Sequence, residues 1–234
     1  MNSFLLRSRR YLLLRSGAGL ARESLLRAWF HLGFLQSSKK ARSMSSAFST
    51  PRADEYLALL EERLPEKTFR HVQSVARFML TYAEEAGITE EQAVAAGLLH
   101  DLCKALKREE LSTRAGLYGI TKHLDNPNLL HGPVGAEECR RELGIVDKDV
   151  LDAIRFHTTG RREWGAVGCA LYLADFAEPL RTIPSAEEAR TILDSEGYPS
   201  ALRYAAVQKE RYVREKFEPD RNATDFFEWI RNLD

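Results

Sequence analysis

Hydrophobic residues recur at helical spacing through most of the chain after residue 52. In the segment 69–85, Val72, Val75, Ala76, Met79 and Ala83 form one stripe, which is typical of a helix that buries one face. No stretch alternates apolar and polar residues over a useful length, so we expect no strand. The pattern predicts helices over 53–63, 69–85, 90–102, 107–117, 131–143, 148–156, 164–180, a segment that begins near Ser185, 201–216 and 225–232.

Capping signals mark several of the expected helix ends. A Ser or Thr followed three residues later by Gln or Glu satisfies two backbone N–H groups at a helix start, and Gly often ends a helix in a left-handed conformation. We therefore place capping boxes at Thr89–Gln92 and Ser185–Glu188, an N-cap at Asp147, and helix ends at Gly87 and Gly144. Residues 116–128 are predicted to form a loop.

The size of the chain allows one substantial core. It has 234 residues, of which 44% are hydrophobic, and a domain of this size buries most of its apolar surface. A stretch rich in Ser, Thr and Pro over residues 45–52 has the composition of a linker. We predict a basic leader with its linker over residues 1–51, and one all-α domain, a helical bundle, over residues 52–234.

The first 43 residues differ from the rest in charge. They hold nine Lys and Arg but one acidic residue, Glu23. This composition is typical of an organelle transit peptide, and it also fits an over-extended start upstream of Met44. A basic amphipathic membrane anchor is less favoured, because the apolar residues there keep no helical period. Both favoured alternatives exclude the segment from the fold.

The remainder of the chain is acidic, and its composition excludes several kinds of protein. From Met44 onward there are 25 basic and 33 acidic residues, a net charge of −8, which argues against a nucleic-acid partner held by a phosphate-binding surface. Cys103, Cys139 and Cys169 are too few and scattered for a disulfide framework or a zinc site built from cysteine pairs. No apolar run approaches the ~20 residues of a membrane span.

Six polar side chains occur where a helical core should be apolar. A lone buried histidine is usually a hydrogen-bonded core residue, and a lone buried aspartate can be explained in the same way. Four histidines and two aspartates, almost all on different helices, instead suggest a shared metal site, because burying each unpaired would cost about 2–7 kcal/mol or more. Imidazole and carboxylate ligands without thiolate suit iron, manganese, zinc or cobalt. The six residues are His71, His100, Asp101, His131, His157 and Asp175.

These residues lie within motifs that resemble a known family. His71, the His100-Asp101 doublet and the distant Asp175 resemble the pattern of the HD-domain metal-dependent phosphohydrolases, which are all-α proteins. The extended motifs are similar to the YqeK-type branch, whose members are bacterial symmetrical bis(5′-nucleosyl)-tetraphosphatases, although Cys103 departs from its pattern. The motifs are AAGLLHDLCK (95–104), LHGPVGA (130–136), AIRFHTTG (153–160) and LADFAEPLR (173–181).

The resemblance implies two metal ions per chain. The family usually carries iron, and manganese or cobalt are the alternatives. It implies that His71, His100, Asp101 and Asp175 hold one metal. Asp101 would bridge to a second metal, completed by His131 and His157. Two neighbouring cations would activate a water for attack on a phosphorus, so no protein nucleophile is needed.

The implied substrate is diadenosine tetraphosphate, cut symmetrically to two ADP. We expect Asp101, His100 and Lys104 to be catalytic residues. Lys104 is also a candidate for binding the phosphate chain, although it could instead be a lysine favoured by the helix dipole. Thr158, Thr159 and Arg181 are the other candidate substrate contacts, through hydroxyl groups and a guanidinium.

Other functions stay open at this point. One alternative is another nucleotide phosphohydrolase of the same fold, such as a nucleoside monophosphatase or a cyclic-dinucleotide phosphodiesterase. Another is a non-catalytic module that senses a nucleotide. We expect neither a nucleic-acid partner nor a membrane partner. The resemblance to the family suggests a homodimer. We expect a cytoplasmic location, or an organelle if residues 1–43 are a transit peptide.

Overall fold

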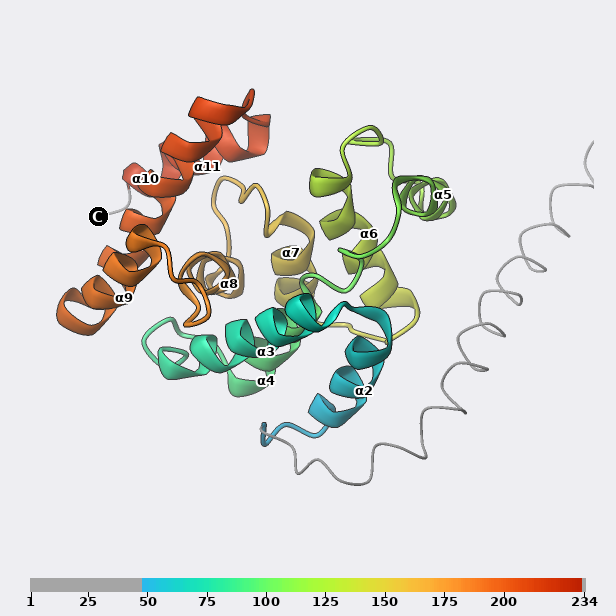
Figure 1. Ribbon diagram of the computed structural model, residues 1–234, viewed down its shortest axis with the longest axis horizontal. Helices are drawn as coiled ribbons and strands as arrows, with labels where there is room; N and C mark the ends of the chain where they lie inside the picture. The colour runs from blue at the N-terminus through green and yellow to red at the C-terminus, as the bar shows by residue number, and fades with distance from the viewer. Residues whose placement is uncertain (1–47, 233–234) are drawn as a thin grey trace, which may run out of the picture. The chain divides into compact units, whose positions relative to one another are not determined.

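The computed structural model describes residues 48–232, which lie within the unit Ser46–Asp234. The expected leader, and the choice between a transit peptide and a late start, fall outside the described residues. The described part is all-α, as predicted, and contains ten helices and no strand (Figure 1). The helices are α2 (Ala53–Arg63), α3 (Glu66–Thr81), α4 (Glu90–Leu99), α5 (Arg108–Tyr118), α6 (Pro127–Arg141), α7 (Lys148–Phe156), α8 (Ala166–Ala177), α9 (Pro184–Glu196), α10 (Tyr198–Lys216) and α11 (Arg221–Arg231).

Several helix bounds differ from the prediction. The helices α2 and α7 have the expected bounds, and the Thr89 capping box and the Asp147 cap are both present. The helix α6 begins at Pro127, inside the expected loop, because Asn126 caps it and Pro127 occupies its first turn. The helix α3 ends at Thr81, and the chain then turns before Gly87. The helices α8, α10 and α11 also begin or end a few residues from their expected bounds.

The predicted capping box at Ser185–Glu188 is wrong. Ile183 is the N-cap of α9 and makes no side-chain cap bond, and Pro184 takes the first helical position. Proline suits that position because its missing N–H would have no helical partner. Ser185 therefore lies inside the first turn, where its hydroxyl does not cap the helix.

The core forms around α8, which lies at the centre of the bundle. Nine of the twelve residues of α8 are buried, and the helix packs against α3, α4, α7, α9 and α10. Such all-round burial explains why its sequence is almost uniformly apolar. Phe48, in the expected linker, is also buried, so this segment contributes one side chain to the core.

No helix in the described part of the chain is long and apolar enough to cross a membrane.

Gly97 allows α3 and α4 to approach closely. A Cβ atom built on Gly97 would lie 2.5 Å from the Cα of Ala76, which is backbone that cannot rotate away. The helix α3 carries His71 and His100 directly follows α4, so this contact also sets the spacing of two candidate ligands.

We expect Gly97→Ala to lower the free energy of unfolding by about 1–3 kcal/mol, because the added methyl group must push two backbones apart. Urea unfolding followed by circular dichroism would measure the change. Gly116→Ala is the matched control, since a Cβ there meets no atom within 4 Å and alanine suits a helix better than glycine. Equal midpoints for Gly97→Ala and the unchanged protein would contradict this reading of the contact.

Candidate metal centre

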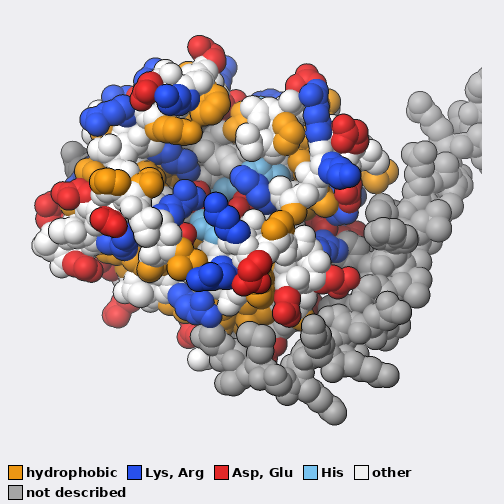
Figure 2. All heavy atoms as spheres, in the orientation of Figure 1, with side chains coloured by type: hydrophobic (Ala, Val, Ile, Leu, Met, Phe, Trp, Pro, Cys, Tyr) orange, Lys and Arg blue, Asp and Glu red, His pale blue; other side chains and the backbone are white. Residues whose placement is uncertain are grey.

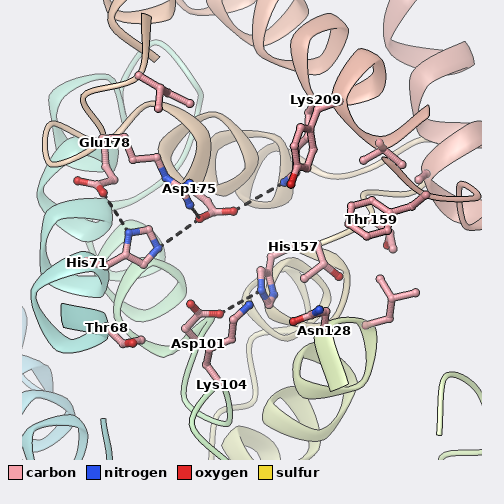
Figure 3. A pocket seen from close by; sticks show the side chains of 18 of the residues that line it. Thr68, His71, Asp101, Lys104, Asn128, His157, Thr159, Asp175, Glu178 and Lys209 are labelled. Carbon is pink, nitrogen blue, oxygen red and sulfur yellow. Dashed lines mark hydrogen bonds and ion pairs between the residues drawn. The ribbon is translucent and has the colours of Figure 1, made fainter. Parts of the chain in front are cut away.

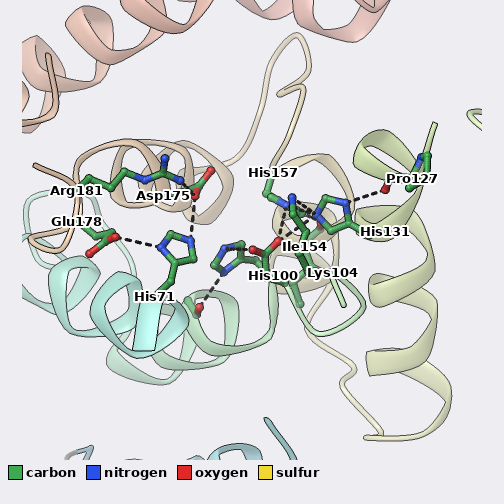
Figure 4. Close-up of polar contacts among 12 residues, drawn as sticks. His71, His100, Lys104, Pro127, His131, Ile154, His157, Asp175, Glu178 and Arg181 are labelled. Atoms are coloured by element: carbon green, nitrogen blue, oxygen red, sulfur yellow. Dashed lines mark hydrogen bonds and ion pairs between the residues drawn. The ribbon is translucent and has the colours of Figure 1, made fainter. Parts of the chain in front are cut away.

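The six polar residues singled out in the sequence lie together at the centre of the bundle (Figures 3 and 4). His71 comes from α3 and Asp175 from α8, whereas His100 and His157 are the residues directly after α4 and α7. Asp101 follows His100 in a series of turns, since α4 ends at Leu99 and not at the predicted residue 102. The sixth residue, His131, lies in α6.

Asp101 is shared by two groups of potential metal ligands. His71, His100 and Asp101 form one group, and Asp101, His131 and His157 form the other. In each group the ligand atoms lie within 4.8 Å of one another. The Oδ1 atom of Asp101 is 3.0 Å from His131 Nε2 and 3.4 Å from His157 Nε2, and its Oδ2 atom is 3.7 Å from His100 Nε2.

Three of the histidines are oriented by backbone carbonyl groups. The Nδ1 atoms of His100, His131 and His157 donate to the carbonyl oxygens of Gly97, Pro127 and Ile154, at 2.9, 3.1 and 2.8 Å. A carbonyl oxygen only accepts, so each Nδ1 carries the proton, and in the neutral ring each Nε2 is left with a lone pair.

The lone pairs of His131 and His157 lie close to each other, and all three face the Asp101 carboxylate. His131 Nε2 lies 3.0 Å from His157 Nε2, and His100 Nε2 is buried without a hydrogen-bond partner. Acceptors this close repel unless a positive charge lies among them. The arrangement therefore fits a metal cation, which accepts electron pairs from neutral imidazole and carboxylate groups.

His71 differs because a carboxylate orients it. Its Nδ1 atom lies 3.1 Å from Glu178 Oε1, and its Nε2 atom faces Asp175 Oδ1 at 3.2 Å (Figure 4). A carboxylate behind a histidine fixes the ring and raises its basicity, an arrangement common around metal-binding histidines. Asp175 is in neither group of potential ligands, and it contacts the first group by pairing with His71.

The pKa values of the site follow from burial and charge. Burial alone would lower the pKa of His71, but Asp175 and Glu178 outweigh it and raise that pKa to about 9. Burial lowers the pKa of His100 to about 4. Burial also opposes ionisation of Asp101, yet the surrounding histidines hold the pKa of its carboxyl well below the usual range. A neutral His100 beside an ionised Asp101 is the protonation state that a cation needs.

We expect Glu178→Ala to weaken metal binding by about 10- to 100-fold, because His71 then loses the carboxylate that orients its ring. Titration of the metal-stripped protein with Mn²⁺ would measure the affinity. Glu178→Gln keeps an acceptor oxygen but removes the charge, so it should have the smaller effect. Unchanged affinity in the alanine variant would exclude this role for Glu178.

Four of the six residues, His71, Asp101, His157 and Asp175, help to line a pocket of about 1290 Å³, whose other lining residues include members of α3, α6, α10 and α11. Lys and Arg side chains surround the opening of this pocket, and histidine side chains are visible inside it (Figure 2). Lys104 Nζ lies 3.5 Å from His131 Nε2, while Arg181 donates to Asp175 Oδ1 at 2.9 Å. The predicted contacts Thr158 and Thr159 also line the pocket, although the Thr159 hydroxyl donates to the Gly160 carbonyl oxygen.

Sequence reasoning missed two residues of this site. Glu178 follows Asp175 by three residues, so their shared position on one helical face could have indicated it. Lys209 from α10 lies 3.7 Å from Asp175 Oδ2 and 4.1 Å above the Tyr172 ring centroid (Figure 3). No spacing rule connects Lys209 with the motifs, because only the packing of α10 on α8 brings it there.

A buried ion cluster is connected to the site through Cys103, which follows Asp101 by two residues. The Glu138 carboxylate of α6 is fully buried and pairs with Arg63 of α2 and Arg114 of α5. The Cys103 thiol lies 3.4 Å from Glu138 Oε2 and donates to it. Burial and the nearby carboxylate raise the pKa of this thiol well above its usual value, so it keeps its proton. Cys103, which departs from the family pattern, therefore has a hydrogen-bond partner in Glu138.

Comparison with known proteins agrees with the sequence motifs. The family model for the HD domain matches residues 68–218. A Bacillus subtilis protein named bis(5′-nucleosyl)-tetraphosphatase, symmetrical, is 34% identical over 145 residues, which cover 61% of this chain and 78% of that protein. A Staphylococcus aureus protein of the same name is 34% identical over 148 residues, covering 59% of this chain and 73% of that protein.

A solved structure has a similar fold. It is described as a predicted HD superfamily hydrolase involved in NAD metabolism from Clostridium acetobutylicum. The TM-score is 0.70 at 30% sequence identity, and the match covers 76% of this chain and 96% of that one. The similarity therefore extends over nearly the whole of the solved chain.

Proposed function

Because the chain belongs to the HD domain family, we propose that it is a metal-dependent hydrolase that cuts diadenosine tetraphosphate symmetrically into two molecules of ADP. The observation that carries the proposal is the His/Asp cluster in the wall of a large pocket that is also lined by lysine and arginine side chains. The volume of this pocket, about 1290 Å³, exceeds the ~300–1,000 Å³ that is usual for pockets that bind small ligands. A dinucleotide needs such space.

The proposed metal ligands divide into two sets. His71, His100, Asp101 and Asp175 would hold one ion, and Asp101, His131 and His157 would hold another; we propose iron, with manganese or cobalt as alternatives. When bound by these residues, the metal would supply Lewis acidity that activates a water and offsets the charge that builds on phosphoryl oxygens.

The chain itself would position the substrate. Lys104, Arg181 and Lys209 line the pocket around the cluster and offer ammonium and guanidinium groups to the four phosphates. Thr158 would add a hydroxyl donor. Since these groups lie beside both sets of proposed ligands, they support a chain of phosphates that passes across the cluster, with a nucleoside at each end.

The test combines metal content with product identity. We expect two metal ions per chain by elemental analysis and ADP as the sole nucleotide product from diadenosine tetraphosphate. A panel with nucleoside monophosphates and cyclic dinucleotides tests the other enzyme functions of this fold. Cleavage of those compounds while diadenosine tetraphosphate survives would exclude the proposal, and hydrolysis of no member of the panel would favour a sensing module.

The cytoplasmic location and the homodimer remain predictions. Mass spectrometry of the native N-terminus would decide between a start at Met44 and a removed leader. Analytical ultracentrifugation would determine the oligomeric state.

A further inference from the structure

Exposed apolar side chains are concentrated at the pocket. Of the eight exposed large hydrophobic residues in the described part of the chain, four line it: Leu180, Ile183, Tyr212 and Phe217. We call these four residues the apolar shelf. Single exposed hydrophobic residues are normal in proteins, but a group of them in one concave surface indicates a binding site.

The two aromatic residues of the shelf are held in place. Tyr212 and Phe217 are 56% and 59% exposed, and their rings meet edge to face with centroids 6.1 Å apart. Tyr212 lies on α10 and Phe217 directly follows the last residue of that helix, and the Asp220 side chain accepts from the Asn222 N–H at the start of α11. The helix α10 thus presents the Tyr212 ring, and the short connection that follows it presents the Phe217 ring, to the same pocket.

The shelf continues directly from the cationic part of the pocket. On α10, Tyr212 follows Lys209 by three residues, which places both on one helical face. In the connection between α8 and α9, Leu180 precedes Arg181 and Ile183 follows it by two residues, and all three line the pocket. Each of these two segments therefore offers a cation and an apolar surface to the same pocket.

This combination selects a ligand with an anionic part and a flat apolar part. We propose that the apolar shelf is the subsite for one nucleobase of the substrate, which stacks on Tyr212 and Phe217 while its phosphates lie along Lys209 and Arg181. The proposal rests on the proposed function, because it takes the phosphate chain to be that of a dinucleotide. Aromatic side chains stack with any base through its π-face, so the shelf would contribute affinity more than base selection.

The test compares a ligand that carries a base with one that does not. Calorimetry on the metal-loaded full chain would measure the affinities for ADP and for inorganic pyrophosphate. We expect Phe217→Ala and Tyr212→Ala to bind ADP roughly tenfold or more weakly, and to bind pyrophosphate as the unchanged protein does. Phe217→Tyr and Tyr212→Phe keep a ring and should retain ADP affinity.

Val207→Ala is the matched control, because Val207 is an exposed apolar residue of α10 that does not line the pocket. It should change neither affinity. Unchanged ADP affinity in both alanine variants would overturn the proposal. So would a dimer that dissociates in these variants while ADP affinity is retained, because the shelf would then contact a second copy of the chain.

The two proposals can fail separately. If the unchanged protein cuts diadenosine tetraphosphate but the alanine variants bind ADP normally, the shelf proposal fails and the proposed function stands. If the protein cuts no dinucleoside tetraphosphate but ADP binding depends on the two rings, the proposed function fails and the base subsite stands.

Discussion

Asp101→Ala is expected to remove the bound metal and the hydrolytic activity together. Asp101 is the only residue common to both groups of potential ligands among the described residues, so its loss weakens both. Metal ions contribute several kcal/mol to transition-state stabilisation, and each 1.36 kcal/mol is a factor of ten in rate. We therefore expect turnover to fall by at least about 10³-fold, with metal content measured on the same sample.

The fold should survive this substitution. Asp101 lies in turns after α4, outside any helix, so its replacement by alanine interrupts no helix. Thermal unfolding of the metal-free forms of both proteins would test this point. Asp152→Ala removes a carboxylate of α7 that pairs with Arg161 at 2.9 Å outside the cluster, and it should keep both metal and activity. Unchanged hydrolysis in Asp101→Ala would exclude the proposed mechanism.

Glu138→Ala is expected to cause the largest loss of stability. The fully buried carboxylate joins α6 to Arg63 of α2, at 2.5 Å, and to Arg114 of α5. Removing one partner of a buried ion pair leaves an uncompensated charge and typically costs about 3–5 kcal/mol. Here two guanidinium groups would lose their shared partner, and the Cys103 thiol would lose its acceptor. Chemical denaturation should therefore shift to a much lower midpoint.

Glu110→Ala serves as its control. Glu110 pairs with the same guanidinium, that of Arg114, at 2.7 Å, but from the solvent side with about half of its side chain exposed. Exposed ion pairs contribute about 0–1 kcal/mol, so this variant should unfold close to the unchanged protein. Similar midpoints for Glu110→Ala and Glu138→Ala would show that burial does not strengthen the inner pair.

Local signals in the sequence were sufficient for the helical class and for several helix ends. The Thr89 capping box and the Asp147 N-cap act within one turn of chain, so their residue types determine the local hydrogen bonds. The Ser185 box failed because Pro184 fits the first helical position better. The start of α6 was missed because Asn126 and Pro127, which signal a loop in many contexts, here cap and begin a helix.

The candidate site shows the same division between local and distant signals. Each polar residue among apolar neighbours is visible in its own segment, but only the set of six and the motifs around them indicated a metal site. The partner of His71 needed helical geometry as well, because Glu178 lies one turn after Asp175. Lys209 and the Glu138 cluster could not be predicted, because each depends on which helices pack together. Residue spacing along the chain does not contain that information.

The wide separation of the site residues along the chain has a consequence for synthesis. His131 lies 30 positions from Asp101 and 26 from His157, whereas His71 lies 107 positions from Glu178. Ribosomes add about 5–20 residues per second, so His71 waits roughly 5 to 20 s for its carboxylate partner. The nascent chain therefore contains every residue of one half of the cluster, that of Asp101, His131 and His157, before α8 is made.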